Sequence, residues 1–325
     1  MKILITGATG FIGRHLTKAL SKIYPVRVLV RQTSDISSIK DCNIGIIYGD
    51  LLTKRSLEPA LDQIDLVYHL AGEVYSRRKN DYYEKNVLAT KNLLEACEEK
   101  GVRRIIFLSS VGVYKPVTQK TLLTEESECD PITYYGKTKL RAEELVKNSN
   151  IHWVIVRAPV VYGPYQPPVL NRFFLDAFKK RKVYVIGKGD NLRSLCYIDN
   201  LVEGLVSLVD KTDVYGRIYI LSDNSPYTFN GIIETGSKVI QQKVKVIHLS
   251  NLLGDISWAI YYLMDNIFNL CFVQLYAIKK MQLEEGCDIT KAKREIGYNP
   301  KVPLEEGIGK TIDWIKNNFK HVKNG

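Results

Sequence analysis

Short apolar runs alternate with longer amphipathic stretches through the first half of the chain. Each run is rich in Val, Ile and Leu without polar alternation, which is typical of strands buried on both faces of a parallel sheet. Helices are predicted between the runs, beginning at Arg14, Arg55, Asn86 and Tyr134. This alternation predicts an α/β fold with a doubly wound parallel sheet. The strands are expected at residues 2–6, 26–30, 44–48, 66–70, 104–109 and 153–157.

A second kind of pattern covers residues 252–281, which are rich in aromatic and aliphatic side chains. A membrane crossing needs about 20 apolar residues in succession. Asp265, Asn266, Asn269 and Gln274 interrupt this segment, so we predict no transmembrane span. Two alternatives stay open: buried or interface helices that form a lid or a dimer face, and a helix in peripheral contact with a membrane surface.

Length and charge narrow the class of protein. With 325 residues, 45% of them apolar, the chain can bury a large core divided between two lobes. Its formal net charge of +11 suits a polyanionic ligand such as a nucleotide. The basic residues are scattered rather than gathered in one run, so we expect no nucleic-acid partner.

The six cysteines show neither a Cys-x-x-Cys pair nor a His-rich metal spacing. We therefore expect reduced thiols, no metal site and a cytoplasmic location. The chain opens directly on its first predicted strand, so no signal peptide is expected.

A glycine loop, Gly7-Ala8-Thr9-Gly10-Phe11-Ile12-Gly13, joins the first predicted strand to the first predicted helix. The first two glycines stand one residue further apart than in the commonest fingerprint for dinucleotides. Glycines let the backbone approach a pyrophosphate closely, and the helix N-terminus presents unpaired N–H groups to the anion. Strand, glycine loop and helix in this order therefore predict dinucleotide binding.

A tyrosine and a lysine stand four residues apart in the run Tyr134-Tyr135-Gly136-Lys137-Thr138-Lys139. This spacing on a helix brings both side chains to one face. We expect the Lys139 ammonium to lower the pKa of the Tyr135 phenol. A tyrosine tuned in this way can exchange a proton with an alcohol or a carbonyl.

Together these segments resemble the extended short-chain dehydrogenase/reductase family, specifically its NAD(P)-dependent epimerase/dehydratase members that act on nucleotide sugars. The resemblance covers nearly the whole chain. It includes Asn86 in NVLATKNLLEAC and the segments at 49–51, 68–72, 109–114, 156–164, 193–199 and 288–308. Their order and spacing carry the resemblance, because each motif alone is unspecific.

The resemblance implies a Rossmann doubly wound sheet with a smaller C-terminal substrate-binding lobe. Residues 1–160 would form the NAD(P)-binding domain, with later strands contributed from about 195–222. Residues 161–325 would form mainly the substrate-binding lobe. The family also implies a homodimer, packed through the helices that carry Asn86 and Tyr135.

The family's catalytic residues match Ser110, Tyr135 and Lys139. Tyr135 would be the general acid/base, and Lys139 would hold the nicotinamide ribose. Ser110 matches better than Ser109, because the reacting residue stands four positions before Tyr114; its hydroxyl would donate to the same substrate oxygen. Arg193 matches an arginine that reaches the substrate diphosphate, with a surface ion pair as the alternative.

Cofactor choice depends on the end of the second predicted strand. Val30 stands where an acidic residue would bind the ribose of NAD, and Arg31 follows, so we expect NADP, with NAD as the alternative. A solvated Arg31, or one stacked on the adenine, also stays open, as does a purely structural Asn86. The implied cofactor-binding residues are Gly7, Thr9, Gly10, Phe11, Ile12, Gly13, Arg31, Asp50, Leu51, Leu70, Ala71, Gly72, Asn86, Tyr135, Lys139 and Pro159.

Departures from the family's subgroups narrow the reaction. The members that dehydrate sugars carry an Asp-Glu pair after the catalytic residue, where this chain has Val111-Gly112. The predicted substrate is therefore a nucleotide-diphosphate sugar that undergoes C4 epimerisation or 4-keto reduction. The alternative is an NADP-dependent ketone or alcohol reductase of the dihydroflavonol-reductase or 3β-hydroxysteroid-dehydrogenase type. A non-catalytic dinucleotide-binding regulator is a lesser alternative, because such relatives usually lose the Tyr or the Lys.

Overall fold

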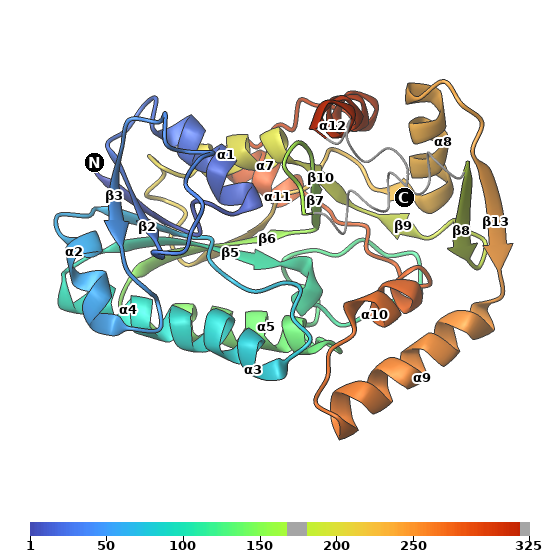
Figure 1. The fold of residues 1–325 in the computed structure, drawn as a ribbon, viewed down its shortest axis with the longest axis horizontal. Helices are drawn as coiled ribbons and strands as arrows, with labels where there is room; N and C mark the ends of the chain where they lie inside the picture. The colour runs from blue at the N-terminus through green and yellow to red at the C-terminus, as the bar shows by residue number, and fades with distance from the viewer. Residues whose placement is uncertain (168–180, 319–325) are drawn as a thin grey trace.

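The computed structural model describes residues 1–167 and 181–318. Its centre is a seven-stranded sheet in the order β11-β6-β5-β4-β1-β2-β3, with every neighbouring pair parallel (Figure 1). All six predicted strands are confirmed, each ending within one residue of its expected bounds. The strands are β1 Ile3–Thr6, β2 Val26–Val30, β3 Ile44–Tyr48, β4 Leu66–His69, β5 Arg104–Ser110, β6 His152–Ala158 and β11 Arg217–Ile220.

Helices cover both faces of this sheet, so the predicted doubly wound fold is confirmed (Figure 1). One face carries α1 Phe11–Leu20, α7 Ile198–Ser207 and α11 Thr290–Ile296, and the other carries α2 Glu58–Leu61, α4 Ala89–Glu99 and α5 Tyr134–Lys147. Side chains alternate along β1: Ile3 and Ile5 join the core beneath α1, whereas Leu4 joins the core beneath α4 and α5. This period of two explains why the strands read as unbroken apolar runs.

Three helix starts differ from the prediction. The first helix begins at Phe11, because the extended backbone of Gly10 ends the loop there. A 3₁₀ turn, η1 Lys54–Leu57, precedes α2. The helix expected from Asn86 begins earlier, as α3 Lys79–Tyr82, and continues through a π-helical turn, η2 Tyr83–Leu88, into α4. Such turns are rare and sit frequently at functional sites.

The second half of the chain forms smaller units beside the carboxyl end of the sheet. Three two-stranded sheets pair β7 with β10, β8 with β13 and β9 with β12. Residues 195–197 therefore pair outside the main sheet, while β11 joins it. The boundary near residue 160 stays a prediction, and 168–180 and 319–325 of the proposed lobe lie outside the described residues. The remaining elements are β7 Val160–Tyr162, β8 Lys182–Ile186, β9 Leu192–Arg193, β10 Leu195–Tyr197, β12 Tyr227–Thr228, α8 Phe229–Val239, β13 Lys245–Leu249 and α12 Leu304–Asn318.

The apolar segment 252–281 folds as two packed helices, α9 Asn251–Ile267 and α10 Val273–Lys280. In Figure 1 they lie at the edge of the molecule, and α9 runs away from the smaller sheets. Across 1–167 and 181–318, no helix has both the length and the apolar character that crossing a bilayer requires.

The glycine loop brings the start of α1 against the backbone of its own turn. A Cβ at Gly13 would lie 2.0 Å from the Gly7 carbonyl oxygen, and one at Gly7 would lie 2.7 Å from the Ala71 nitrogen. Gly7 also has a φ of +73°, which side chains rarely adopt. Only glycine lets β1, α1 and the end of β4 meet this closely.

The variant Gly13→Ala tests this contact. Its methyl group must displace backbone, so the free energy of unfolding should fall by about 1–3 kcal/mol. The matched control is Gly309→Ala in α12, where the added Cβ would meet only Val239 Cγ1 at 3.8 Å. That change should be neutral or stabilise by up to about 1 kcal/mol, because alanine favours helix. Urea denaturation measures both variants, and equal effects would contradict the crowding at Gly13.

Candidate active site

The predicted catalytic serine and tyrosine meet where β5 ends and α5 begins. A 3₁₀ turn, η3 Val111–Val113, follows β5, and its Gly112 N–H donates to Ser110 Oγ at 3.0 Å. The Thr133 hydroxyl caps α5 by accepting from the Gly136 N–H at 3.1 Å. The bond from Gly112 uses a lone pair of Ser110 Oγ, so the Ser110 hydroxyl can still donate its hydrogen, and Tyr135 stands in the first turn of its helix.

A close backbone approach holds these two segments together. A Cβ at Gly136 would lie 2.2 Å from the Gly112 carbonyl oxygen and 2.6 Å from Pro131 Cβ. Glycine at this position therefore lets α5 seat directly on η3. The ring of Tyr135 then lies close to Gly112, beside Ser110.

Ser109 has a different role from Ser110. Its hydroxyl donates to Glu143 Oε1 at 2.6 Å, and Arg157 donates to both oxygens of that carboxylate at 3.0 and 2.7 Å. All three residues are buried. Ser109 thus belongs to an internal ion-pair network between β5, β6 and α5, as expected of a strand-end residue.

The phenol of Tyr135 is held protonated. Burial raises its pKa to about 12, and a hydrogen bond with the side chain of Ser110 acts in the opposite direction without outweighing it. Tyr135 is therefore a proton donor at neutral pH in this structure.

Lys139 is buried, whereas Tyr135 is half-buried. Its Nζ donates to the Leu108 carbonyl at 2.7 Å and lies 4.1 Å from the centroid of the Phe107 ring. Burial lowers the pKa of Lys139 to about 7, against the opposing effect of the Glu143 carboxylate. The expected lowering of the Tyr135 pKa by Lys139 is wrong for this structure, because burial of the phenol dominates.

Asn86 joins the loop after β4 to α5. Its Oδ1 accepts from the Glu73 N–H at 2.7 Å, and its Nδ2 donates to the Glu73 carbonyl and to Thr138 Oγ1, each at 3.1 Å. Thr138 Oγ1 in turn donates to the Tyr135 carbonyl at 2.9 Å. The asparagine that the sequence marked is thus a buried support for the catalytic helix.

A cleft of about 300 Å³ lies at the carboxyl ends of the central strands, where the sheet order reverses between β1 and β4. The N-terminus of α1 faces it without a side-chain cap or an acidic residue in its first turn. Its N–H groups and dipole therefore suit an anion such as a pyrophosphate. Nine predicted cofactor residues line the cleft: Gly7, Thr9, Gly10, Arg31, Asp50, Leu51, Leu70, Ala71 and Gly72.

The other predicted cofactor residues do not line this cleft: Phe11, Ile12, Gly13, Asn86, Tyr135, Lys139 and Pro159. Gly13 supports the loop from behind, and Pro159 is buried after β6. The sequence did not single out Ser34 or Lys85, which do line it, and Gly49 stood only in a segment of the family resemblance. Lys85 Nζ lies 2.7 Å from Glu73 Oε2 at the rim. No motif marks that pair, because the fold alone brings the two residues together.

Arg31 stands at the adenosine end of the predicted cofactor site. Its side chain is exposed, and in the described parts of the chain no hydrogen bond or ion pair holds it. The nearby Asp35 carboxylate accepts from the Ser37 N–H at 2.9 Å and forms no ion pair with Arg31 among the described residues. The guanidinium of Arg31 is therefore available to an anionic group in the cleft.

Arg193, the predicted diphosphate contact, is not brought into contact with Ser110, Tyr135 or Lys139. It is buried in β9, donates to Glu285 at 2.6 Å and to the Lys280 and Leu283 carbonyls, and lies over the Phe229 ring. Lys280 Nζ approaches the same carboxylate at 3.0 Å. The internal pair with Glu285 replaces the surface ion pair that the sequence left open.

These features form a dinucleotide-type cleft beside a Ser-Tyr-Lys set. A model of the NAD dependent epimerase/dehydratase family matches residues 3–221. The chain belongs to this family. The prediction of an extended short-chain dehydrogenase/reductase enzyme is thereby confirmed.

Relatives in the family cover the chain almost end to end. An uncharacterised protein of Sinorhizobium fredii, y4nL, is 32% identical over 99% of this chain and 96% of its own length. The mouse decarboxylating sterol-4-α-carboxylate 3-dehydrogenase is 26% identical over 99% and 92%. The Escherichia coli N-acetyl-α-D-glucosaminyl-diphospho-ditrans,octacis-undecaprenol 4-epimerase is 26% identical over 99% and 96%.

A solved structure of the family agrees with the fold. UDP-glucuronic acid 4-epimerase from Bacillus cereus, in complex with NAD, superposes with a TM-score of 0.78 at 27% identity. The match covers 98% of this chain and 99% of that one. The two proteins therefore share the same overall fold.

Lys139→Met tests the burial of the ammonium. The folded-state pKa of about 7 lies below the usual 10.5, so the charged lysine destabilises the fold below pH 7, and this effect disappears as the pH rises towards 10.5. The Tm of Lys139→Met should exceed that of the wild type at pH 6, and the difference should shrink between pH 7 and 10.

The control is Lys137→Met, which changes an exposed lysine on the same helix. Its Tm difference from the wild type should not follow pH. Scanning calorimetry measures the Tm of the three proteins between pH 6 and 10. If the Tm of both variants followed pH in the same way, the result would contradict a buried ammonium at Lys139.

Proposed function

We propose that the protein is an NAD(P)-dependent 4-epimerase of a sugar diphosphate, with Ser110, Tyr135 and Lys139 as its catalytic residues. The observation that carries the proposal is the seating of α5 on η3, which holds the Ser110 hydroxyl beside the Tyr135 phenol at the end of β5. Two proton donors then converge on one substrate oxygen, as an alcohol–ketone interconversion at C4 requires.

The proton chemistry follows from the two perturbed groups. Tyr135 donates its proton when a ketone oxygen becomes an alcohol and takes it back in the reverse direction. Ser110 can stabilise the same oxygen in both directions, because its lone pair, and not its hydrogen, is used by Gly112. The bound dinucleotide supplies the hydride acceptor and donor. Lys139, with a pKa of about 7, can hold the ribose hydroxyls.

The surroundings of Ser110 support simple oxidation and reduction over dehydration. Val111 is buried and Gly112 packs under α5, so neither position can supply a second acid or base. Among the relatives, two act on C4 of a sugar diphosphate: UDP-glucuronic acid in one and a diphospho-undecaprenol in the other. We assign Arg193 to the binding of the substrate diphosphate. On binding, the diphosphate would replace Glu285 as the partner of Arg193.

A second candidate is an NADP-dependent reductase of a ketone or alcohol. Arg31 favours it: the side chain is exposed and has no ion-pair partner among the described residues, and a guanidinium in that place can hold the 2′-phosphate of NADP. The sterol dehydrogenase among the relatives is of this broad reaction type. We also propose a homodimer through α4 and α5, supported by the exposed apolar side chains of Tyr83 and Leu88 on η2.

Tyr135→Phe should lower the epimerisation rate by about 10²–10⁴-fold, the usual contribution of a positioned acid/base. Tyr134→Phe is the matched control and should keep most of the activity. UDP-glucose, UDP-N-acetylglucosamine and UDP-glucuronic acid are offered in D₂O, and NMR follows the product. A C4 epimer without deuterium on carbon is expected. Deuterium at C3 or C5, or full activity of Tyr135→Phe, would refute the mechanism.

The cofactor state separates the two candidates. The protein is purified without added nucleotide and denatured, and any released dinucleotide is identified by chromatography. Stoichiometric, tightly held NAD(H) or NADP(H) is expected, because an epimerase recycles its cofactor within each turnover. An empty site that binds NADPH reversibly and far more tightly than NADH would favour the reductase.

Arg31→Gln tests the phosphate contact. Losing one charged hydrogen-bonded pair should weaken NADPH binding by about 10- to 100-fold, while NADH binding stays the same. The control is Arg217→Gln, which removes the same charge from an exposed position. Arg217 lies on β11, one edge strand of the sheet, whereas Arg31 follows β2 near the other edge. Fluorescence titration measures the dissociation constants of NADPH and NADH for each protein. Equal losses for NADPH and NADH would show that Arg31 does not read the 2′-phosphate.

A further inference from the structure

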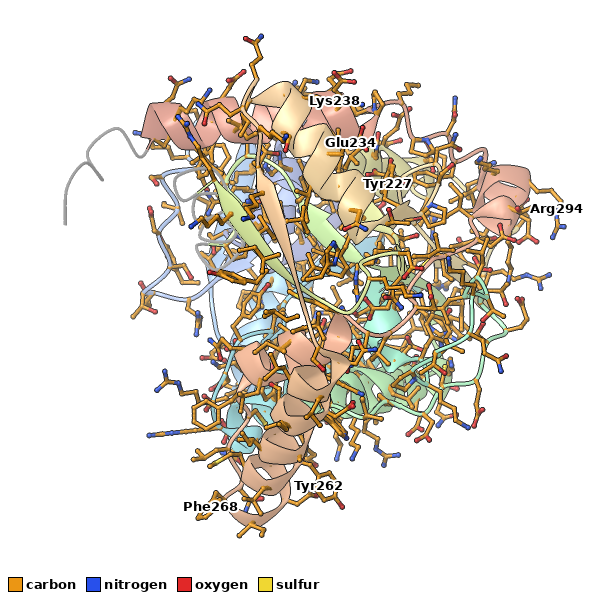
Figure 2. The ribbon with its side chains drawn as sticks, turned by 90° about the vertical axis from the view of Figure 1, so that its right-hand side faces the viewer. Tyr227, Glu234, Lys238, Tyr262, Phe268 and Arg294 are labelled. Carbon is orange, nitrogen blue, oxygen red and sulfur yellow. The ribbon has the colours of Figure 1, made fainter. Side chains whose placement is uncertain are left out.

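Helix α9 exposes an apolar face along its full length. Seven apolar side chains of α9, and that of Phe268 directly after the helix, are between 41% and 64% exposed. Leu253, Ile256, Ile260, Leu263 and Ile267 recur every three or four residues, so they lie in a band on one side of the helix, with Leu252 beside its start and Tyr262 and Phe268 flanking its end. Figure 2 shows Tyr262 and Phe268 projecting at the free end of α9. This outer stripe consists of Leu252, Leu253, Ile256, Ile260, Tyr262, Leu263, Ile267 and Phe268.

The opposite face of α9 is locked to the protein. A Cβ at Gly254 would lie 2.3 Å from Gln282 Oε1, and Ser257 Oγ donates to the Leu275 carbonyl at 2.8 Å. Tyr261 and Asp265 are buried on the same side. The helix therefore cannot rotate to bury the outer stripe against α10, and the stripe faces outward as part of the fold.

The charges around α9 leave this surface positive. Its two carboxylates are neutralised within the protein, Asp255 by Lys279 at 2.7 Å and Asp265 by Lys79 at 3.2 Å. Beside the end of the helix lie two exposed arginines, Arg77 and Arg78. Backbone contacts hold both arginines there: the Cys271 N–H donates to the Arg77 carbonyl, and the backbone of Arg78 pairs with that of Leu270 in an isolated antiparallel β-bridge. Within the described residues, no carboxylate pairs with either arginine.

We propose that the outer stripe, together with Arg77 and Arg78, docks the protein on an anionic lipid membrane. An apolar band that ends at unpaired cations is complementary to acyl chains beneath negative headgroups. A second copy of this chain bound at the same surface would instead bring the same two arginines to the contact, where they would repel. At about 1.5 Å per residue, the 17 residues of α9 form a helix that is too short to cross the hydrocarbon core of a bilayer. The helix would therefore lie along the membrane surface.

Docking in this way places the candidate active site beside the lipid. The hydroxyl of Tyr261, on the inner face of α9, lies near the backbone of Tyr134, the residue before Tyr135. Lys79 pairs with Asp265 and also lies 5.1 Å from the centre of the Tyr134 ring. The helix that meets the membrane is thus the one that contacts the start of α5. Membrane docking goes beyond the proposed function and does not depend on it.

Vesicle flotation of the full chain, without substrate, tests the proposal. The protein should float with vesicles made of equal parts phosphatidylglycerol and phosphatidylcholine and weakly with phosphatidylcholine alone. The four-site variant Ile256→Gln/Ile260→Gln/Leu263→Gln/Ile267→Gln should lose more than tenfold in partitioning. The matched control is Ile23→Gln, which alters a side chain that is 62% exposed in the turn after α1 and should change nothing.

The arginines are tested separately from the stripe. At about 1 kcal/mol per basic residue near an anionic surface, Arg77→Gln/Arg78→Gln should weaken binding to anionic vesicles about thirtyfold and leave binding to neutral vesicles unchanged. The control Arg103→Gln/Arg217→Gln removes the same charge from two exposed positions away from α9 and should bind like the wild type.

Two results would overturn the proposal. One is a folded four-site variant that floats as well as the wild type. The other is a lipid-free wild type whose oligomer, seen by sedimentation velocity, dissociates in that variant, which would make the stripe a protein interface. If the four-site variant does not fold by circular dichroism, the single change Ile267→Glu replaces it; its side chain is 64% exposed, and about tenfold weaker anionic binding is expected.

Discussion

The arrangement of the candidate site depends on one buried amide, the side chain of Asn86. Its oxygen and both of its N–H groups are bonded, to the backbone of Glu73 on one side and to Thr138 on the other. A buried amide is costly unless every donor and acceptor has a partner. The loop after β4, the π-helical turn η2 and the catalytic helix α5 must therefore take the positions in which these bonds form together.

Close backbone contacts at two glycines also fix the geometry of the candidate site. Gly13 on Gly7, and Gly136 on Gly112, remove the side chains that would separate helix from loop. These contacts leave Tyr135 half-buried and Lys139 buried, and burial shifts the pKa of each group in the direction that disfavours its charged form. The same packing that positions the phenol beside Ser110 keeps it protonated, and it brings the pKa of Lys139 close to neutral pH.

Helix α9 shows how one element can serve two surroundings. Its inner residues Ser257, Tyr261 and Asp265 make specific polar contacts, whereas its outer residues are apolar and exposed. A buried helix would need no such division, and an ordinary surface helix would carry polar side chains outward. The polar interruptions that argue against a membrane crossing include Asp265, which is the residue that anchors the helix through Lys79.

Local patterns in the sequence predicted the six strands and the glycine loop, whereas the preference for Ser110 over Ser109 came from the family resemblance. Apolar runs predicted the strands, and glycine spacing between a strand and a helix predicted the loop. Four features became visible only in the three-dimensional packing: the π-helical start before Asn86, the pairing of Lys85 with Glu73, the internal pairing of Arg193 with Glu285 and the raised pKa of Tyr135. Each of these depends on burial or on partners distant in the chain, for which a linear pattern carries no signal.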